Sequence, residues 1–263
     1  MGTLDLILDI GNTRTKLAIY QGGRALSHQV IENGDTAAIE EFLGGAVPDA
    51  ITVGSTANPD PATIAQLRQL APVLVLSGDS LSPLQVAYGT RHTLGADRLA
   101  NAVAAVGRFP GRPILVIDAG TCITYDLCEA EGTYRGGAIS PGMHMRSKAM
   151  YAYSARLPKV DPDPSPEFLG ETTEDSLAAG MHFGILGEME GFIRRLGKER
   201  PGMVVVITGG DAVRFVRGLE SGIFALPYLT LEGYHALLQH HRALTGGVLP
   251  FGTAGSSGTS PAG

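Results

Sequence analysis

The feature that most constrains the fold of this chain is a strand-turn-strand pattern near its N-terminus. Over residues 4–20, apolar residues run up to Asp9, a Gly-Asn-Thr corner follows, and Lys16 opens a second apolar run. Gly11 and Asn12 tolerate the backbone conformations of a sharp turn. Such a turn can present backbone N–H groups to phosphate oxygens, and Asp9 can hold Mg²⁺ directly or through water. Taken alone, the stretch is equally compatible with an ordinary hairpin whose polar residues satisfy only turn hydrogen bonds.

The same pattern occurs again in the second half of the chain. An apolar run, an aspartate and a glycine recur in the same order, followed by a second strand and a glycine at the same offset. The matched segments are 6–11 with 115–120, 16–20 with 123–127, Gly23 with Gly132, and 51–55 with 203–211. Because the spacing is shared across several landmarks, the sequence predicts two copies of one β-β-β-α-β-α unit.

The predicted fold is therefore α/β, with mixed sheets covered by helices. Domain 1–112 would hold the first copy, domain 113–251 the second, and the low-complexity tail 252–263 would be disordered. Expected strands outside the repeated hairpins are 24–31, 50–53, 72–76, 133–139 and 203–207. Expected helices are 37–43, 61–70, 98–107, 143–156, 172–198 and 231–240.

Composition and charge narrow the class of protein. The chain has 263 residues with a formal net charge of −6 and no long basic run, which disfavours nucleic-acid binding. Cys122 and Cys128 have no metal-site spacing and are too few for a disulfide framework, so reduced thiols in a cytoplasmic protein are expected. The N-terminus enters a strand at once and no apolar run could span a bilayer, so we expect neither signal peptide nor membrane association.

The duplication suggests a shared binding site. Two such domains would place both Asp-x-Gly turns around one ligand, which then meets two carboxylates and two sets of N–H donors. This suits a nucleoside triphosphate with a metal ion, because phosphoryl transfer depends mainly on positioning and charge neutralisation. The chain has no GxxxxGK[ST], GxGxxG, HExxH or GxSxG pattern, which disfavours P-loop NTPases, dehydrogenases, zincins and α/β hydrolases.

Five motifs make a family resemblance specific. They are DIGNTRTK at 9–16, GADR at 95–98, DAGT at 118–121, GGAISPG at 136–142 and TGGD at 208–211. With the duplication, they resemble the acetate kinase, sugar kinase, Hsp70 and actin superfamily, and within it the type III pantothenate kinases. The resemblance covers the chain up to the tail. It implies two ribonuclease H-like domains with five-stranded mixed sheets around a central nucleotide cleft, and ATP-dependent conversion of pantothenate to 4'-phosphopantothenate, the first step of coenzyme A biosynthesis.

The resemblance also implies where ATP and the cations bind. The phosphate-binding residues would be Asp9, Ile10, Gly11, Asn12, Thr13, Arg14, Thr15 and Lys16, with Thr121 as a further ATP contact. Asp9 would be oriented toward Mg²⁺, directly or through water. Asp118 would hold a monovalent cation, K⁺ or NH₄⁺.

For the acceptor, Asp97 matches the family's general base, which takes the proton of the pantothenate hydroxyl. The expected pantothenate-binding residues are Tyr88, Gly95, Ala96, Asp97, Arg98 and Thr173, the last donated across a homodimer interface. From local sequence alone, the simpler interpretation is that Asp97 is the N-cap of the helix that follows. A carboxylate of ordinary pKa can nevertheless serve as the acceptor, so the two roles are compatible.

Two other functions stay open at the level of sequence. One is a non-catalytic relative acting as an accessory factor in transcription, which the presence of Asp9, Asp97 and Asp118 disfavours. The other is a kinase for a different small alcohol on the same scaffold, which only the acceptor pocket can separate.

Overall fold

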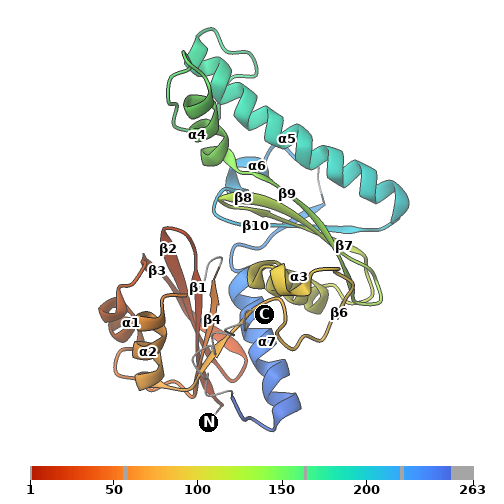
Figure 1. Ribbon diagram of the computed structural model, residues 1–263. Coiled ribbons are helices and arrows are strands. Elements are labelled where there is room, and N and C mark those ends of the chain that lie inside the picture. The colour runs from red at the N-terminus through yellow and green to blue at the C-terminus, as the bar shows by residue number, and fades with distance from the viewer. Residues whose placement is uncertain (1, 56–58, 163–164, 220–221, 250–263) are drawn as a thin grey trace, which may run out of the picture.

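The computed structural model describes residues 2–55, 59–162, 165–219 and 222–249, and within these the strands form two mixed sheets (Figure 1). The first sheet has the order β3-β2-β1-β4-β5, with β1 antiparallel to β2 and parallel to β4. Its strands are β1 (Leu4–Ile10), β2 (Arg14–Gln21), β3 (Arg24–Glu32), β4 (Ala50–Ser55) and β5 (Val73–Val75). The predicted disordered tail lies outside the described residues.

The second sheet repeats this order, as the duplication predicts. Its strands run β11-β10-β7-β8-β9-β6, so β9-β8-β7-β10-β11 corresponds to the whole first sheet. Its members are β6 (Gln85–Val86), β7 (Ile114–Ala119), β8 (Cys122–Cys128), β9 (Thr133–Pro141), β10 (Val204–Thr208) and β11 (Ile223–Ala225). The α/β class with two mixed sheets is confirmed, but five strands was wrong for this sheet. The additional strand β6 comes from the first half of the chain and pairs parallel with β9.

The helices begin where the sequence offers caps. Asp35, Asp60 and Thr172 each accept a hydrogen bond from a backbone N–H in the first turn of the helix that follows. The helical segments are α1 (Thr36–Leu43), α2 (Pro61–Leu70), the 3₁₀ turn η1 (Arg91–Thr93), α3 (Ala96–Arg108), α4 (Met143–Tyr153), α5 (Thr173–Glu199), α6 (Ala212–Phe215) and α7 (Leu229–Thr245). None of these described helices has both the length and the apolar character needed to cross a bilayer.

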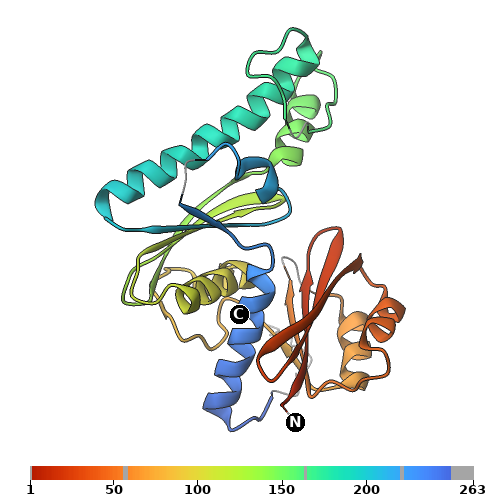
Figure 2. The same ribbon diagram turned by 180° about the vertical axis from the view of Figure 1, so that it is seen from behind.

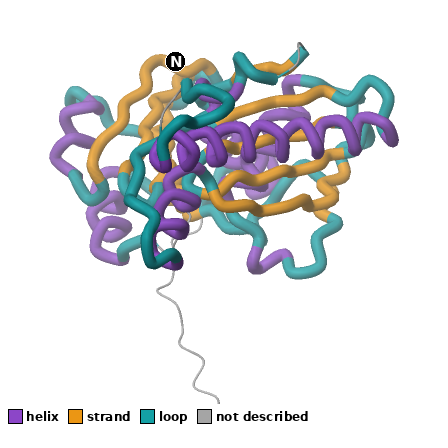
Figure 3. Tube along the Cα trace, turned by 90° about the horizontal axis from the view of Figure 1, so that it is seen from above, coloured by secondary structure: helices purple, strands orange, loops and turns teal. Residues whose placement is uncertain are grey.

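The sheets and helices alternate in layers. Helices α1 and α2 cover the outer face of the first sheet, and α3 and α7 lie together between the two sheets (Figures 1 and 2). The long helix α5 crosses the outer face of the second sheet, as the view from above shows (Figure 3). The middle layer is therefore shared: α3 contacts strands of both sheets, and α7 packs on α3 and on the first sheet.

Strand alternation decides which side chains face this middle layer. In β1, Leu6 and Leu8 pack outward with α1 and α2, whereas Ile7 packs inward with α3 and α7. Strand β7 follows the same rule, with Leu115 and Ile117 outward and Val116 inward. Because side chains two residues apart share a face, Asp9 and Asp118 both point toward the α3–α7 layer.

The C-terminal helix joins the two halves. Although α7 follows the second sheet in the chain, it packs on β1, β2 and β4 of the first. The Arg242 guanidinium donates to both oxygens of the buried Asp5 carboxylate, at 2.7 and 2.8 Å. The division at 112/113 remains a prediction, and α7 of the second half belongs spatially with the first sheet.

Candidate active site

The structure brings the two Asp-x-Gly turns into contact. The Asn12 side-chain amide donates to the Thr121 hydroxyl across 3.4 Å. Each turn is closed by a 3.0 Å backbone bond from its glycine, from Gly11 N–H to the Arg14 carbonyl three residues on and from Gly120 N–H to the Cys122 carbonyl two residues on. One hairpin belongs to each sheet, so this contact places the repeated motifs at a common site.

A residue outside the predicted set fixes the first turn. The Asn33 amide donates to the Gly11 carbonyl at 2.8 Å, and its oxygen accepts from the Thr15 hydroxyl at 2.8 Å. Asn12, Thr13 and Arg14 at the tip are exposed. The turn is thus held from behind, which leaves its tip available to a ligand.

Asp9 lies at the end of β1, directly opposite Lys16 on β2. The Lys16 ammonium is 3.9 Å from its carboxylate, and the Tyr234 hydroxyl of α7 donates to it at 3.4 Å. Burial raises the pKa of Asp9 to about 6, because it outweighs the favourable charge of Lys16, while the nearby charge of Asp97 raises it further. This carboxylate is therefore short of positive charge.

Asp118 occupies the equivalent place at the end of β7. Its carboxylate accepts a 2.9 Å bond from the Asn101 amide of α3. Burial raises the pKa of Asp118 to about 7, and the charges of Asp97 and Asp9 add to the shift. Gly209, at φ +96°, packs so closely on Asp118 that a Cβ there would clash with it.

Asp97 lies inside α3, not at its N-cap. The helix begins at Ala96 and its N-cap is Gly95, so the N-cap interpretation was wrong. An Asp97 carboxylate oxygen accepts from Arg98 N–H at 2.8 Å and approaches Gly95, where any Cβ would clash with it. Burial raises the pKa of Asp97. Its charge raises the pKa of both Asp9 and Asp118, so the three carboxylates share one region.

Arg98 points away from solvent. It is 5% exposed, and its guanidinium donates to Asp126 from Nη2 at 2.6 Å and from Nε at 3.0 Å. The Tyr134 hydroxyl donates to the same carboxylate at 2.6 Å. Tyr88 is half-buried, with its ring 5.8 Å from the Arg98 guanidinium carbon. This buried cluster anchors the start of α3 to the second sheet, so Arg98 fixes the position of Asp97.

The remaining predicted residue, Thr173, lies elsewhere in the chain's own fold. It is exposed and begins α5, a helix that contacts α4 and lies on the side of the second sheet away from the first (Figure 1).

Asn101, Thr230 and Tyr234 were missed from sequence. Asn101 had a usable signal, because it follows Asp97 by one turn in an alanine-rich helix. Thr230 and Tyr234 had none, since only the packing of α7 brings them to the site.

The carboxylates around the two turns could bind cations whose remaining ligands come from the substrate and from water. Among the described residues, no group of three or more His, Cys, Asp or Glu side chains could hold a metal alone. The carboxylates of Asp9, Asp97 and Asp118 nevertheless lie close enough for their charges to raise the pKa of Asp9 and Asp118, and Lys16 is the cation paired with Asp9. Mg²⁺ is commonly held by one or two carboxylates plus substrate phosphates and water, which matches this donor set.

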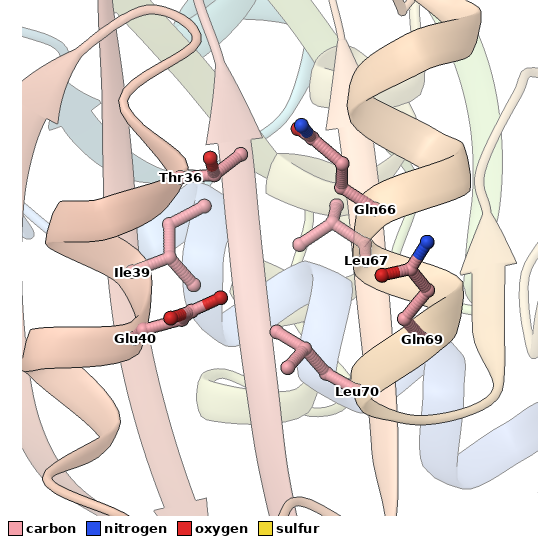
Figure 4. Close-up of a pocket in the computed structure, with 7 residues that line it drawn as sticks. All are labelled: Thr36, Ile39, Glu40, Gln66, Leu67, Gln69 and Leu70. Carbon is pink, nitrogen blue, oxygen red and sulfur yellow. The ribbon is translucent and has the colours of Figure 1, made fainter.

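Two cavities lie on the outer side of the first sheet. The first cavity, of about 160 Å³, lies between α1 and α2, with Ile39 and Leu67 on opposite walls (Figure 4). It contains none of the predicted site residues. A neighbouring cavity of about 380 Å³ reaches Gly11, Asn12 and Thr15 and thus borders the first turn from behind. The site is defined by its carboxylates and turns, not by the cavity shown in Figure 4.

Comparison with solved structures agrees with the fold. A Clostridium difficile activator of 2-hydroxyisocaproyl-CoA dehydratase with bound ADPNP has a TM-score of 0.52 at 12% identity, covering 95% of this chain and 100% of that one. A Campylobacter jejuni protein assigned to a Baf family of transcriptional activators has a TM-score of 0.58 at 20% identity, covering 90% and 99%. At these identities the likeness shows the fold alone.

Sequence comparison gives the family. A family model described as type III pantothenate kinase matches residues 5–195. A type III pantothenate kinase of Bacteroides fragilis is 39% identical over 240 residues, covering 90% of this chain and 98% of the relative. One from Christiangramia forsetii is 37% identical over 242 residues, covering 91% and 99%. Together with the duplicated fold and the paired turns, these matches show that the chain belongs to the type III pantothenate kinase family.

Proposed function

We propose that the protein transfers the γ-phosphoryl group of ATP to the hydroxyl of pantothenate, giving 4'-phosphopantothenate and ADP at the entry to coenzyme A biosynthesis. The observation that carries this proposal is the convergence of Asp9, Asp97 and Asp118 where the two turns meet. Family membership supports the identity of the substrates.

The reaction needs an acceptor for one proton. As the pantothenate hydroxyl oxygen attacks the γ-phosphorus, the bond to the β,γ-bridging oxygen breaks and ADP leaves. Asp97 takes the hydroxyl proton. Its raised pKa favours proton uptake, and its backbone bond to Arg98 holds it in place.

The first hairpin would hold the phosphates. The exposed tip at Asn12, Thr13 and Arg14 and the Lys16 ammonium are suited to phosphate oxygens. Asp9, with two oxygens and little countercharge, would face Mg²⁺, which neutralises the phosphate charge that develops in the transition state.

The second hairpin would hold a monovalent cation. Asp118 has a neutral amide as its hydrogen-bond partner and no cation of its own to pair with among the described residues, and the charges of two carboxylates outweigh that of Lys16. A K⁺ or NH₄⁺ ion there would offset this charge, and Thr121 would contact ATP.

An ADP-release assay tests the function. Purified protein with ATP, Mg²⁺ and K⁺ should release ADP only when pantothenate is added, and the product should carry one phosphate on the pantothenate hydroxyl. Absence of pantothenate-dependent ADP release would overturn the proposal. If ADP is released with another small alcohol but not with pantothenate, the protein is a kinase with a different substrate.

We further infer that the protein acts as a homodimer in which Thr173 serves the partner's site. Thr173 is exposed at the start of α5, which packs on the outer face of the second sheet, whereas Asp118 lies on the inner face of that sheet. Gly180, Gly184 and Gly187 form an exposed stripe on α5, which permits close approach of a second helix.

Subunit mixing tests this arrangement. Asp97→Asn and Thr173→Ala should each be inactive as a pure homodimer. When the two are co-expressed, the heterodimer contains one site with both native residues, so activity should return. No recovery in an isolated heterodimer would contradict the shared site.

A further inference from the structure

Helix α7 sends two hydroxyl groups toward the aspartates of the two hairpins. Thr230 and Tyr234 are one helical turn apart, so their side chains leave the same side of α7. Tyr234 reaches Asp9 of the first sheet, and Thr230 reaches the partner of Asp118 in the second. A single helix thereby contacts both carboxylate systems.

The connection to Asp118 runs through Asn101. The Thr230 hydroxyl donates to the Asn101 oxygen at 2.9 Å, and the Asn101 amide donates to Asp118 at 2.9 Å. Thr230 is 6% exposed and Asn101 1%, so water does not compete for these bonds. With the Asn101 oxygen occupied by Thr230, its NH₂ group is directed at the carboxylate. The opposite orientation would set two oxygens against each other.

The connection to Asp9 is direct. The Tyr234 hydroxyl donates to Asp9 at 3.4 Å, longer than the roughly 2.7–2.8 Å usual for a hydroxyl donor. The Tyr234 ring is fully buried against Gly54, where a Cβ would clash with it. This packing fixes the ring, but the length of the bond indicates a weaker hold than that on Asp118.

The position of α7 itself is tightly determined. Gly233 lies against the Ala100 backbone of α3, and any Cβ at Gly233 would clash with the Ala100 carbonyl. Further along the helix, Arg242 is paired with the buried Asp5 of β1. Since α7 is fixed to both α3 and the first sheet, its two hydroxyl groups have a fixed relation to each other.

We propose that Thr230 and Tyr234 are positioning residues, with Thr230 orienting Asp118 through Asn101 and Tyr234 orienting Asp9. This inference rests on the roles proposed above, in which Asp118 holds the monovalent cation and Asp9 faces Mg²⁺. It adds that the two hydroxyl groups of one helix act on different sites: each orients the carboxylate that would bind one of the two cations. Removing either should affect one ion and spare the other.

Two variants test this division, each with a matched control. Thr230→Val and Tyr234→Phe remove only the hydroxyl and keep the shape. Thr245→Val removes a hydroxyl at the far end of α7, where it bonds backbone carbonyls. Tyr20→Phe removes the hydroxyl of a buried tyrosine that stacks on His235 of α7. The Tyr20 hydroxyl has no hydrogen-bond partner among the described residues.

The readout is ion binding, followed through melting temperature and independent of turnover. K⁺ is titrated in one series, and Mg²⁺ in another with a non-hydrolysable ATP analogue present. Thr230→Val should raise the half-saturating K⁺ concentration about tenfold and leave that of Mg²⁺ unchanged. Tyr234→Phe should raise the half-saturating Mg²⁺ concentration about threefold and leave that of K⁺ unchanged, because its bond is longer. Both controls should match the wild type.

The possible outcomes distinguish positioning by α7 from the proposed cation roles of Asp9 and Asp118. If both variants shift both ions equally, or neither differs from its control, positioning by α7 is overturned while the cation roles stand. If the wild type responds to neither ion, the roles of Asp9 and Asp118 fail, and the positioning proposal fails with them. Pantothenate-dependent ADP release is measured separately and tests the overall function.

Discussion

The two hairpins share a fold but differ in the residue opposite the aspartate. In the first, Lys16 of β2 faces Asp9 and carries a compensating charge. In the second, Thr124 of β8 faces Asp118, and the hydrogen-bond partner is the neutral Asn101. Burial is the main cause of the raised pKa of both carboxylates, about 7 for Asp118 and about 6 for Asp9, and the charge of Lys16 opposes the shift in each.

This difference shows how a duplicated scaffold can specialise. Strand alternation delivers both carboxylates to the same α3–α7 layer, and the residue directly across the hairpin then differs, a lysine in the first and a threonine in the second. A hairpin with its own lysine is suited to phosphates and their Mg²⁺. A hairpin without one leaves a carboxylate that a bound cation can neutralise, so we infer that the second hairpin depends on a cation from solution.

The largest effect is expected at Asp97, which lies between the hairpins. Asp97→Asn removes the proton acceptor but keeps the size of the side chain and the contact with Gly95. The kcat should fall by about 10²–10⁴-fold, the range general bases contribute, while the melting temperature and oligomeric state stay near wild type. Retention of wild-type kcat would show that Asp97 is not the base.

Removing the lysine makes the first hairpin resemble the second. Lys16→Met should lower kcat about 100-fold, as expected when one preorganised charge leaves a phosphoryl-transfer site. The exposed Lys159→Met serves as the control and should be neutral. If added K⁺ restored the Lys16→Met rate, the two hairpins would be interchangeable and the distinction between them would fail.

A third test uses the glycine that packs on the second hairpin. Gly209 has φ +96° and leaves no room for a Cβ, so Gly209→Ala should reduce stability by about 1–3 kcal/mol. At Gly210 an added Cβ meets no atom within 4 Å, so Gly210→Ala should cost little. Chemical denaturation compares the two, and equal stability would show that the second turn adapts freely.

The smallest effect is a pH dependence of stability. A carboxylate whose pKa is raised in the folded state binds its proton more tightly there than in the unfolded chain, so stability is lost as pH rises toward about 7. Without K⁺, Asp118→Asn should therefore flatten the fall in melting temperature between pH 5 and pH 8. An unchanged slope would place the shifted group elsewhere.

Much of this architecture could be predicted from sequence. The apolar runs of β1 and β7, the turn residues Gly11 and Asn12 and most helix ranges are local signals, and the repeat links them. Strand β6 was not predicted because a strand of two residues is too short to show an alternating apolar pattern. The long-range partners escaped for another reason: the hold of Tyr234 on Asp9 depends on packing between segments far apart in the chain.

Arg98 illustrates the same limit within a motif. The family resemblance implies that Arg98 contacts pantothenate, and this stays a prediction. Its burial against Asp126 depends on where β8 lies, which no local pattern specifies.

The most direct test of the difference between the hairpins is the cation dependence of turnover. The rate of pantothenate-dependent ADP release is measured in K⁺ and in Na⁺ at equal ionic strength, for the wild type and for Asp118→Asn. We expect the wild type to be faster in K⁺ by about tenfold, the size of effect a tuned metal site commonly shows, and the variant to be slow in both salts. Equal wild-type rates in K⁺ and Na⁺, or a variant that keeps its preference for K⁺, would contradict a cation bound at the second hairpin.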